Sequence, residues 1–89
     1  MTKNKMTLTE EMIKHFKKEI RKDNVYIVMP RGYSKPRQKW DKVSNDDIEI
    51  IHMIPHPQSI EWKIRVHGLF KFAVVKNQHG FHIQQLQFD

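Results

Sequence analysis

Six histidines, a large share for a chain of 89 residues, are the first side chains that could do chemistry. Two pairs have the spacing of metal ligands, His52 with His56 and His79 with His82, and on a helix either pair could bind zinc. Both pairs fall at strand ends and turns, and the chain has no cysteine and no evident third ligand. We therefore predict no metal site and no other cofactor. Histidines that gain a proton in mild acid would instead strengthen anion binding.

Acidic side chains offer a second possible chemistry. Asp46 and Asp47 precede one expected strand, and the sequence "EWK" places Glu61 and Lys63 on the next. This pattern resembles the acid and Glu-x-Lys arrangement of restriction-endonuclease-like nucleases, in which acids hold a divalent metal and the lysine helps to position a water. The resemblance covers only the residues from Asp46 to Lys63, and the chain has a hairpin where that family has a further helix and strand. A nuclease is the third-ranked function.

A ribonuclease without metal would need an acid, a base and charge-stabilising side chains around the scissile phosphate. The chain offers residues of suitable types, which are His67, His82, Lys63, Arg65 and Tyr33. Their spacing does not bring them together, and the sequence contains no glycine-rich phosphate loop and no nucleophile motif. We therefore expect a protein that binds without catalysing.

The segment "PRGYSKPRQKW", residues 30–40, has the strongest functional pattern. Cations neutralise phosphates, which supplies most of the affinity for nucleic acids, and aromatic faces stack on unpaired bases. The segment supplies both kinds of side chain, in Arg31, Lys35, Arg37, Lys39, Tyr33 and Trp40. Lys18, Arg21 and Lys22, at the end of an expected helix, would add phosphate contacts if they lie beside it. The alternative is that the aromatic rings close the small core while the cations keep the loop solvated.

The charge distribution favours a polyanionic partner. All of the net charge of +6 comes from the first half of the chain, since residues 1–45 carry 12 lysines and arginines against 5 acids, and residues 46–89 carry 4 against 5. Such an asymmetry is typical of proteins that bind nucleic acids. A basic surface can equally dock on an acidic protein, so composition does not separate these two partners.

An N-terminal helix is the first element expected to position these residues. Residues 7–22 have the apolar periodicity of an amphipathic helix. The apolar positions on its one face are Leu8, Met12, Ile13, Phe16 and Ile20. Thr7 and Glu10 have capping-box spacing, with Thr9 as the competing N-cap. The helix is expected to end at Asp23-Asn24.

Five short β-rich runs follow the helix. Residues 24–30 are apolar on both faces, which is typical of an interior strand. The second run, residues 46–55, is expected to place Ile48, Ile50 and Ile54 on one face and Ile51 and Met53 on the other. The third run, residues 59–68, alternates between a buried face and a wet one. Its buried side chains are Ile60, Trp62, Ile64 and Val66, and its wet ones are Glu61, Lys63, Arg65 and His67.

The last two runs complete the expected sheet. A reversal at His67-Gly68 leads into residues 69–76, where Phe70, Phe72 and Val74 share a face, and a turn with a positive φ at Gly80 leads into residues 81–88. The order predicts an α+β fold, one N-terminal amphipathic helix packed on an antiparallel meander of about five strands.

The chain is expected to form one small domain. It would comprise a disordered tail at residues 1–6 and a single α+β domain at residues 7–89, with a long basic loop at residues 30–45. No apolar run approaches the ~18 residues of a membrane span, so the expectation is a soluble cytoplasmic protein that does not bind membranes.

The predicted function is that of a small, basic, non-catalytic nucleic-acid-binding protein, with DNA and RNA equally open. The rival hypothesis is a small regulator or inhibitor, which could be encoded by a phage or mobile element and would bind an acidic or nucleic-acid-binding protein through the same loop. A homodimer through an exposed edge strand such as Phe81–Phe88 is a further expectation.

Overall fold

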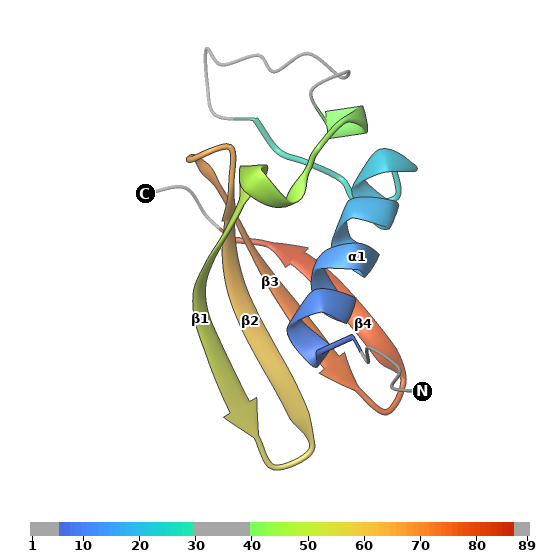
Figure 1. Ribbon diagram of the computed structural model, residues 1–89, viewed down its shortest axis with the longest axis vertical. Helices are drawn as coiled ribbons and strands as arrows, with labels where there is room; N and C mark the ends of the chain where they lie inside the picture. Colours follow the sequence, from blue (N-terminus) through green and yellow to red (C-terminus); the bar gives the residue numbers. More distant parts are fainter. Residues whose placement is uncertain (1–5, 30–39, 87–89) are drawn as a thin grey trace, which may run out of the picture.

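The computed structural model describes residues 6–29 and 40–86, and Figure 1 shows their arrangement. In this part of the chain, the helix α1 (Leu8–Arg21) lies on one face of a four-stranded sheet. The strands are β1 (Ile48–His56), β2 (Ser59–Val66), β3 (Phe70–Asn77) and β4 (Gly80–Gln85), and a short 3-10 helix, η1 (Asn45–Asp47), leads into β1. Each strand pairs antiparallel with the next along the chain. The predicted α+β fold is confirmed, with four strands in place of five.

The helix α1 begins with the capping box that the sequence predicts. The hydroxyl of Thr7 accepts a hydrogen bond from the backbone N–H of Glu10 (3.1 Å), and the carboxylate of Glu10 accepts one from the N–H of Thr7 (2.8 Å). Thr7 is therefore the N-cap. The competing residue Thr9 has another task, because its hydroxyl accepts a hydrogen bond from the indole Nε1 of Trp62 on β2 (3.1 Å).

The helix ends in a Schellman motif at Asp23-Asn24, as predicted. Asp23 adopts a φ of 61°, its N–H donates to the carbonyl of Ile20 (3.1 Å), and the N–H of Asn24 donates to the carbonyl of Glu19 (2.9 Å). Aspartate and asparagine tolerate this left-handed conformation better than most residues. The motif sends the chain away from the helix axis towards β4.

No helix in the described residues is long and apolar enough to cross a lipid bilayer.

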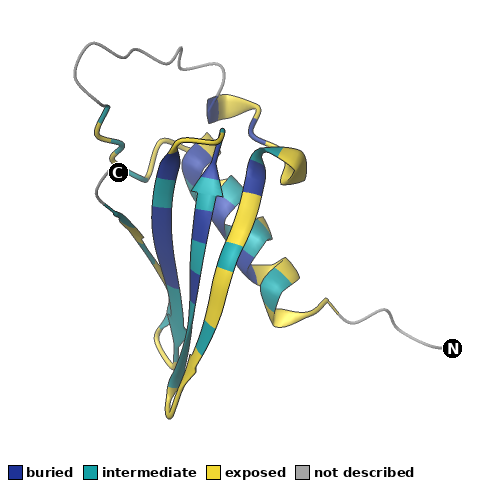
Figure 2. Cartoon of the chain, turned by 90° about the vertical axis from the view of Figure 1, so that its left-hand side faces the viewer, coloured by how far each residue is buried: buried dark blue, intermediate teal, exposed yellow. Residues whose placement is uncertain are grey.

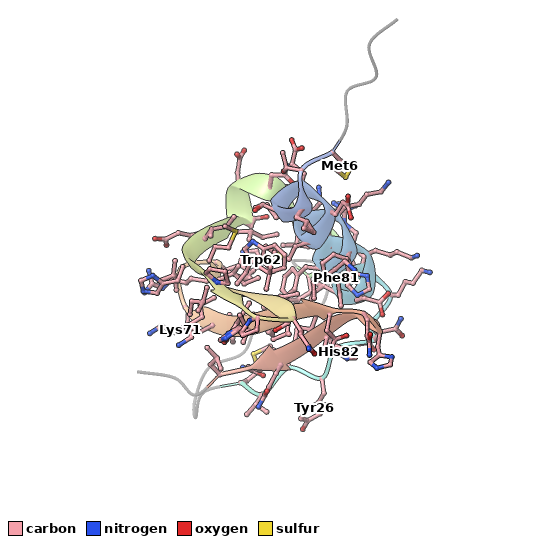
Figure 3. All side chains as sticks on the ribbon, turned by 90° about the horizontal axis from the view of Figure 1, so that it is seen from below. Met6, Tyr26, Trp62, Lys71, Phe81 and His82 are labelled. Atoms are coloured by element: carbon pink, nitrogen blue, oxygen red, sulfur yellow. The ribbon has the colours of Figure 1, made fainter. Side chains whose placement is uncertain are left out.

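The core lies between α1 and the sheet, and Figure 2 shows its buried residues. The fully buried side chains of the two layers are Met12, Phe16, Ile20, Trp62, Ile64, Val66, Phe70, Phe72 and Val74. Phe16 meets Phe72 edge-on with ring centroids 5.1 Å apart, and Figure 3 shows Trp62 between α1 and the sheet. The alternation predicted for the third run is thus confirmed on its buried side. By contrast, β1 is exposed along most of its length.

A β-bulge in β1 overturns the predicted faces of that strand. The register with β2 shifts between Ile50 and His52, so Ile51 is an extra residue in β1. The alternation restarts after the bulge, and Met53 therefore lies on the helix side of the sheet while Ile54 lies on the outer face. The alternation of residues along a strand does not reveal an inserted residue, so the faces predicted for Met53 and Ile54 are wrong.

Residues 24–29 are not the interior strand that the sequence predicts. They run past the end of β4, where the carboxamide of Gln85 accepts a hydrogen bond from the N–H of Val28 (2.7 Å) and donates one to its carbonyl (2.9 Å). One side chain thus takes the place of a paired strand. The residues on both sides of Val28 are partly buried against the core, but Val28 itself is 50% exposed and Tyr26 is 85% exposed. The apolar run therefore has one buried face, whereas an interior strand needs two.

The two reversals that the sequence predicts at His67-Gly68 and at Gly80 are present in the sheet. His67 and Gly68 both have positive φ, 55° and 73°, and the N–H of Leu69 donates to the carbonyl of Val66 (3.2 Å). Two successive residues with positive φ are typical of a type I′ turn, whose twist matches that of the strands, and the pairing of Val66 with Phe70 leaves residues 67–69 as the connection. Gly80 has a φ of 111°, as expected for the second reversal.

We predict that Thr7→Ala lowers the free energy of unfolding by about 1 kcal/mol, because the substitution leaves the N–H of Glu10 without its capping acceptor. Urea unfolding followed by circular dichroism measures the change. Lys14→Ala, an exposed substitution in the middle of α1, is the control and is expected to change the value by less than about 0.5 kcal/mol. Equal effects of the two substitutions would show that the capping box contributes nothing.

Candidate nucleic-acid interface

Most of the predicted binding residues lie outside the described part of the chain. These are Arg31, Tyr33, Lys35, Arg37 and Lys39, all within residues 30–39. The structure does place the residues on both sides of this segment. Met29 packs against the core, and Trp40 is 1% exposed. The residues that flank the segment on both sides are therefore anchored in the core.

Trp40 is a core residue. Its indole meets the rings of His67 and Phe70 edge-on, with centroids 5.0 Å away in each case. A ring that is covered in this way cannot stack on a base, so the stacking role given to Trp40 is not compatible with its position. Burial, the alternative that the sequence left open, is what the structure shows. Trp40 instead supports the segment that precedes it, because it holds residue 40 against the turn between β2 and β3.

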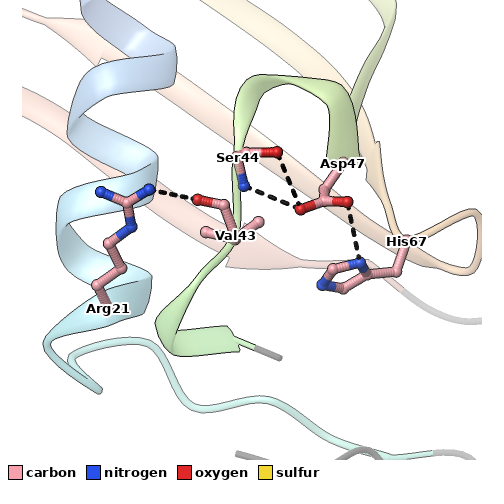
Figure 4. A network of polar contacts seen from close by, with 5 residues as sticks. All are labelled: Arg21, Val43, Ser44, Asp47 and His67. Atoms are coloured by element: carbon pink, nitrogen blue, oxygen red, sulfur yellow. Dashed lines mark hydrogen bonds and ion pairs between the residues drawn. The ribbon is translucent and has the colours of Figure 1, made fainter. Parts of the chain in front are cut away.

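Two hydrogen bonds fasten residues 43–45 to the last turns of α1. The guanidinium of Arg21 donates to the carbonyl of Val43 (2.6 Å), as Figure 4 shows, and the ammonium of Lys17 donates to the carboxamide oxygen of Asn45 (2.6 Å). The side chain of Val43 is itself fully buried. The C-terminal end of α1 therefore lies against the residues that follow segment 30–39.

A carboxylate continues this network to the sheet (Figure 4). Asp47 accepts hydrogen bonds from the backbone N–H of Ser44 (2.9 Å) and from its hydroxyl (3.3 Å), and its second oxygen lies 3.7 Å from Nδ1 of His67. The N–H of His67 also donates to the carbonyl of Asp47 (2.9 Å). The short helix η1 is thereby tied to the hairpin turn on which Trp40 packs.

The three predicted cations of α1 lie at this end of the molecule. Lys18, Arg21 and Lys22 are exposed, and the guanidinium of Arg21 donates the hydrogen bond to Val43. The end of a helix favours positive charge because its last carbonyls carry partial negative charge. Figure 1 shows the C-terminal end of α1, residues 24–29 and residues 40–44 at the upper end of the molecule. We name Lys18, Arg21 and Lys22 the basic end.

The acids of the nuclease hypothesis do not converge. Asp47 adjoins the end of β1 that pairs with Val66, whereas Glu61 lies five residues before Val66 along β2, roughly 17 Å away at the rise of a strand. The carboxylate of Glu61 lies 3.1 Å from Nε2 of His56. Among residues 6–29 and 40–86 the structure contains no group of three metal-binding side chains.

The outer face of the described strands carries charged side chains and no phenylalanine, tyrosine or tryptophan. Arg65 donates a hydrogen bond to Glu49 (3.1 Å), and Glu61 pairs with His56 rather than with Lys71. His67, which the alternation placed on this face, is not part of it. Its left-handed backbone turns the side chain, 10% exposed, towards Trp40 and Asp47.

The side chains of the ribonuclease hypothesis are equally dispersed. His67 is enclosed at the turn between β2 and β3, His82 lies on β4, and Tyr33 lies outside the described residues. Arg65 is engaged with Glu49 on the outer face of the sheet. The described members of this set therefore do not surround a common point.

A groove that the sequence did not indicate lies between α1, residues 24–26 and β4. It has a volume of about 400 Å3, and its walls include His15, Glu19, Asn24, Tyr26, Phe81 and His82. The one signal in the sequence is a tyrosine in the otherwise aliphatic run "VYIVM". The histidines of the groove come from a helix and from a strand 67 positions later, so no motif connects them.

Comparisons with known proteins identify no relative. No protein-family model, no curated protein and no solved structure matches this chain. The function must therefore be inferred from the charges, the burial and the contacts of the chain's own residues.

We predict that Asp47→Ala lowers the free energy of unfolding by about 1–3 kcal/mol, because two donors of Ser44 lose a charged acceptor and His67 loses its neighbouring carboxylate. Urea unfolding followed by tryptophan fluorescence measures the change, since Trp40 packs on His67. Asp46→Ala removes the same charge one residue away from an exposed side chain and is the matched control. If both variants unfold at the same urea concentration, the carboxylate of Asp47 does not hold η1 in place.

Proposed function

We propose that this protein binds nucleic acids without reading their sequence, through the basic end and segment 30–39. The observation that carries the proposal is the hydrogen bond from Arg21 to the carbonyl of Val43. This bond joins the cationic end of α1 to the residues that follow the cationic segment. Two groups of cations that are separate in the sequence are therefore attached to one end of the fold.

The charges at this end suit phosphate. Segment 30–39 contributes four cations and no acid, and Lys18 and Lys22 present exposed ammonium groups nearby. Each phosphate that a lysine or arginine neutralises releases counterions, which makes binding favourable and dependent on salt. The burial of Trp40 supports this proposal, because Trp40 anchors the end of the cationic segment in the core and its own ring is not required to contact the nucleic acid.

The expected binding mode has no base-specific readout. Recognition of duplex sequence by a helix-turn-helix protein requires a second helix in the major groove. Among the described residues α1 is the only helix of more than three residues, and its apolar face is buried against the sheet. Contacts to the phosphate backbone position a protein on nucleic acid but carry no sequence information directly.

We predict that affinity for generic DNA and RNA falls steeply with salt, and that replacing Arg31, Lys35, Arg37 and Lys39 with alanine abolishes it. Lys18→Ala combined with Lys22→Ala should reduce the slope of log affinity against log salt by about 1.4 to 1.8, because each lysine neutralises one phosphate. Fluorescence anisotropy of a labelled duplex at several salt concentrations measures both quantities.

Lys63→Ala combined with Lys71→Ala is the matched control. It removes the same charge from the outer face of the sheet, so the salt slope should stay unchanged. An equal loss of slope in the two double variants would indicate that only net charge matters. The proposal is wrong if the native chain binds neither DNA nor RNA at low salt.

A further inference from the structure

The groove beside the basic end crosses the edge of the sheet. Figure 3 shows Phe81 on the helix side of β4, and His82 and Tyr26 on the opposite side. All three residues line the groove, together with His15 from α1. Among the described strands β4 is the last of the sheet, so the edge of β4 that lines the groove pairs with no other described strand.

The groove is rich in flat rings. Tyr26 is 85% exposed, and its side chain makes no hydrogen bond to another described residue. Phe81 stacks on His15 with ring centroids 5.0 Å apart and an angle of 24° between the planes. Tyr26 is thus a large, rigid ring left in water on the wall of the groove, and exposed aromatic faces of this kind stack on unpaired bases.

The open edge adds hydrogen-bonding groups. The N–H of Leu86 donates to the carbonyl of Lys71 (2.8 Å), so Leu86, and every second residue before it on β4, directs its backbone groups to β3. Phe81 and Ile83 therefore direct their N–H and carbonyl groups away from the sheet, where they line the groove. These donors and acceptors can bond the polar edge of a base.

The charges differ between the groove and the basic end. His15, Glu19 and Lys22 are spaced four and three residues apart along α1, so they follow one another along one face of the helix, from the groove to the basic end. The carboxylate of Glu19, which accepts a hydrogen bond from Asn24 (3.2 Å), disfavours an anion inside the groove. A neutral base suits the groove, while Lys18 and Lys22 suit the adjoining phosphates.

We propose that the groove binds an unpaired base of a single-stranded nucleic acid, with Tyr26 stacking on the base and the backbone of Phe81 and Ile83 bonding its edge. This inference rests on the proposed function and narrows it to the single-stranded substrate class. A paired base cannot enter, because its edge is occupied and its faces are stacked within the duplex. Binding of single strands should therefore be tighter than binding of the matched duplex.

The test uses the full chain and compares Tyr26→Ala with Tyr26→Phe and Val28→Ala. Val28→Ala removes an exposed apolar side chain from the same segment but outside the groove, and it keeps the backbone bonds to Gln85. Fluorescence anisotropy measures the affinity for a labelled oligothymidylate, an oligouridylate and a duplex at several salt concentrations. The high exposure of Tyr26 makes loss of folding in its variants unexpected, and circular dichroism checks it.

The expected result is a loss of single-strand affinity in Tyr26→Ala of about fivefold to a hundredfold, the contribution of one stacked base. Duplex affinity and the salt slope should not change, because tyrosine carries no charge. Tyr26→Phe and Val28→Ala should bind as the native chain does. A single-strand affinity that is unchanged in Tyr26→Ala would overturn this inference and leave the proposed function standing. A native chain that binds none of the three probes would overturn both.

Discussion

The packing of Trp40 on Phe70 and His67 is the interaction on which the rest of the structure depends. A domain of this size has a small core, and α1 covers the sheet chiefly over β3 and β4. Trp40 and Val43, which follow segment 30–39 in the sequence, complete that core. Because their burial fixes the chain beside the last turn of α1, the cations before them are attached at a defined place.

We propose different roles for two neighbouring surfaces, the basic end and the groove along β4. Cations at the end of α1 lie where the helix dipole favours them, and they face solvent because the apolar positions of α1 are used by the core. The groove along β4 is less basic, with an aromatic lining and an open strand edge. A strand of nucleic acid could thus place its phosphates on one surface and a base on the other.

The sequence predicted the elements whose signals are local. The capping box at Thr7, the end of α1 at Asp23-Asn24 and the turns at Gly68 and Gly80 each depend on residues a few positions apart, and all are present. The burial of Trp62 followed from the alternation of its strand.

Features that depend on distant residues could not be predicted. A pattern of alternating residues does not reveal the extra residue Ile51 in β1. The apolar run at residues 24–29 predicts a strand, because no pattern in the sequence indicates that the side chain of Gln85 bonds the backbone of Val28. The groove brings together His15 and His82 from opposite ends of the chain. Trp40 is buried because it packs on His67 and Phe70, and these contacts cannot be read from the composition of the segment.

The most direct test of the account is a nuclear magnetic resonance titration of the labelled chain with a short DNA duplex at low salt. We predict that the amide signals of Lys18, Lys22 and residues 40–43 shift together, with the same apparent affinity, since one surface carries them. Shifts concentrated at Lys63 and Lys71, with none at the end of α1, would contradict the account, because the sheet rather than the basic end would then contact the phosphates.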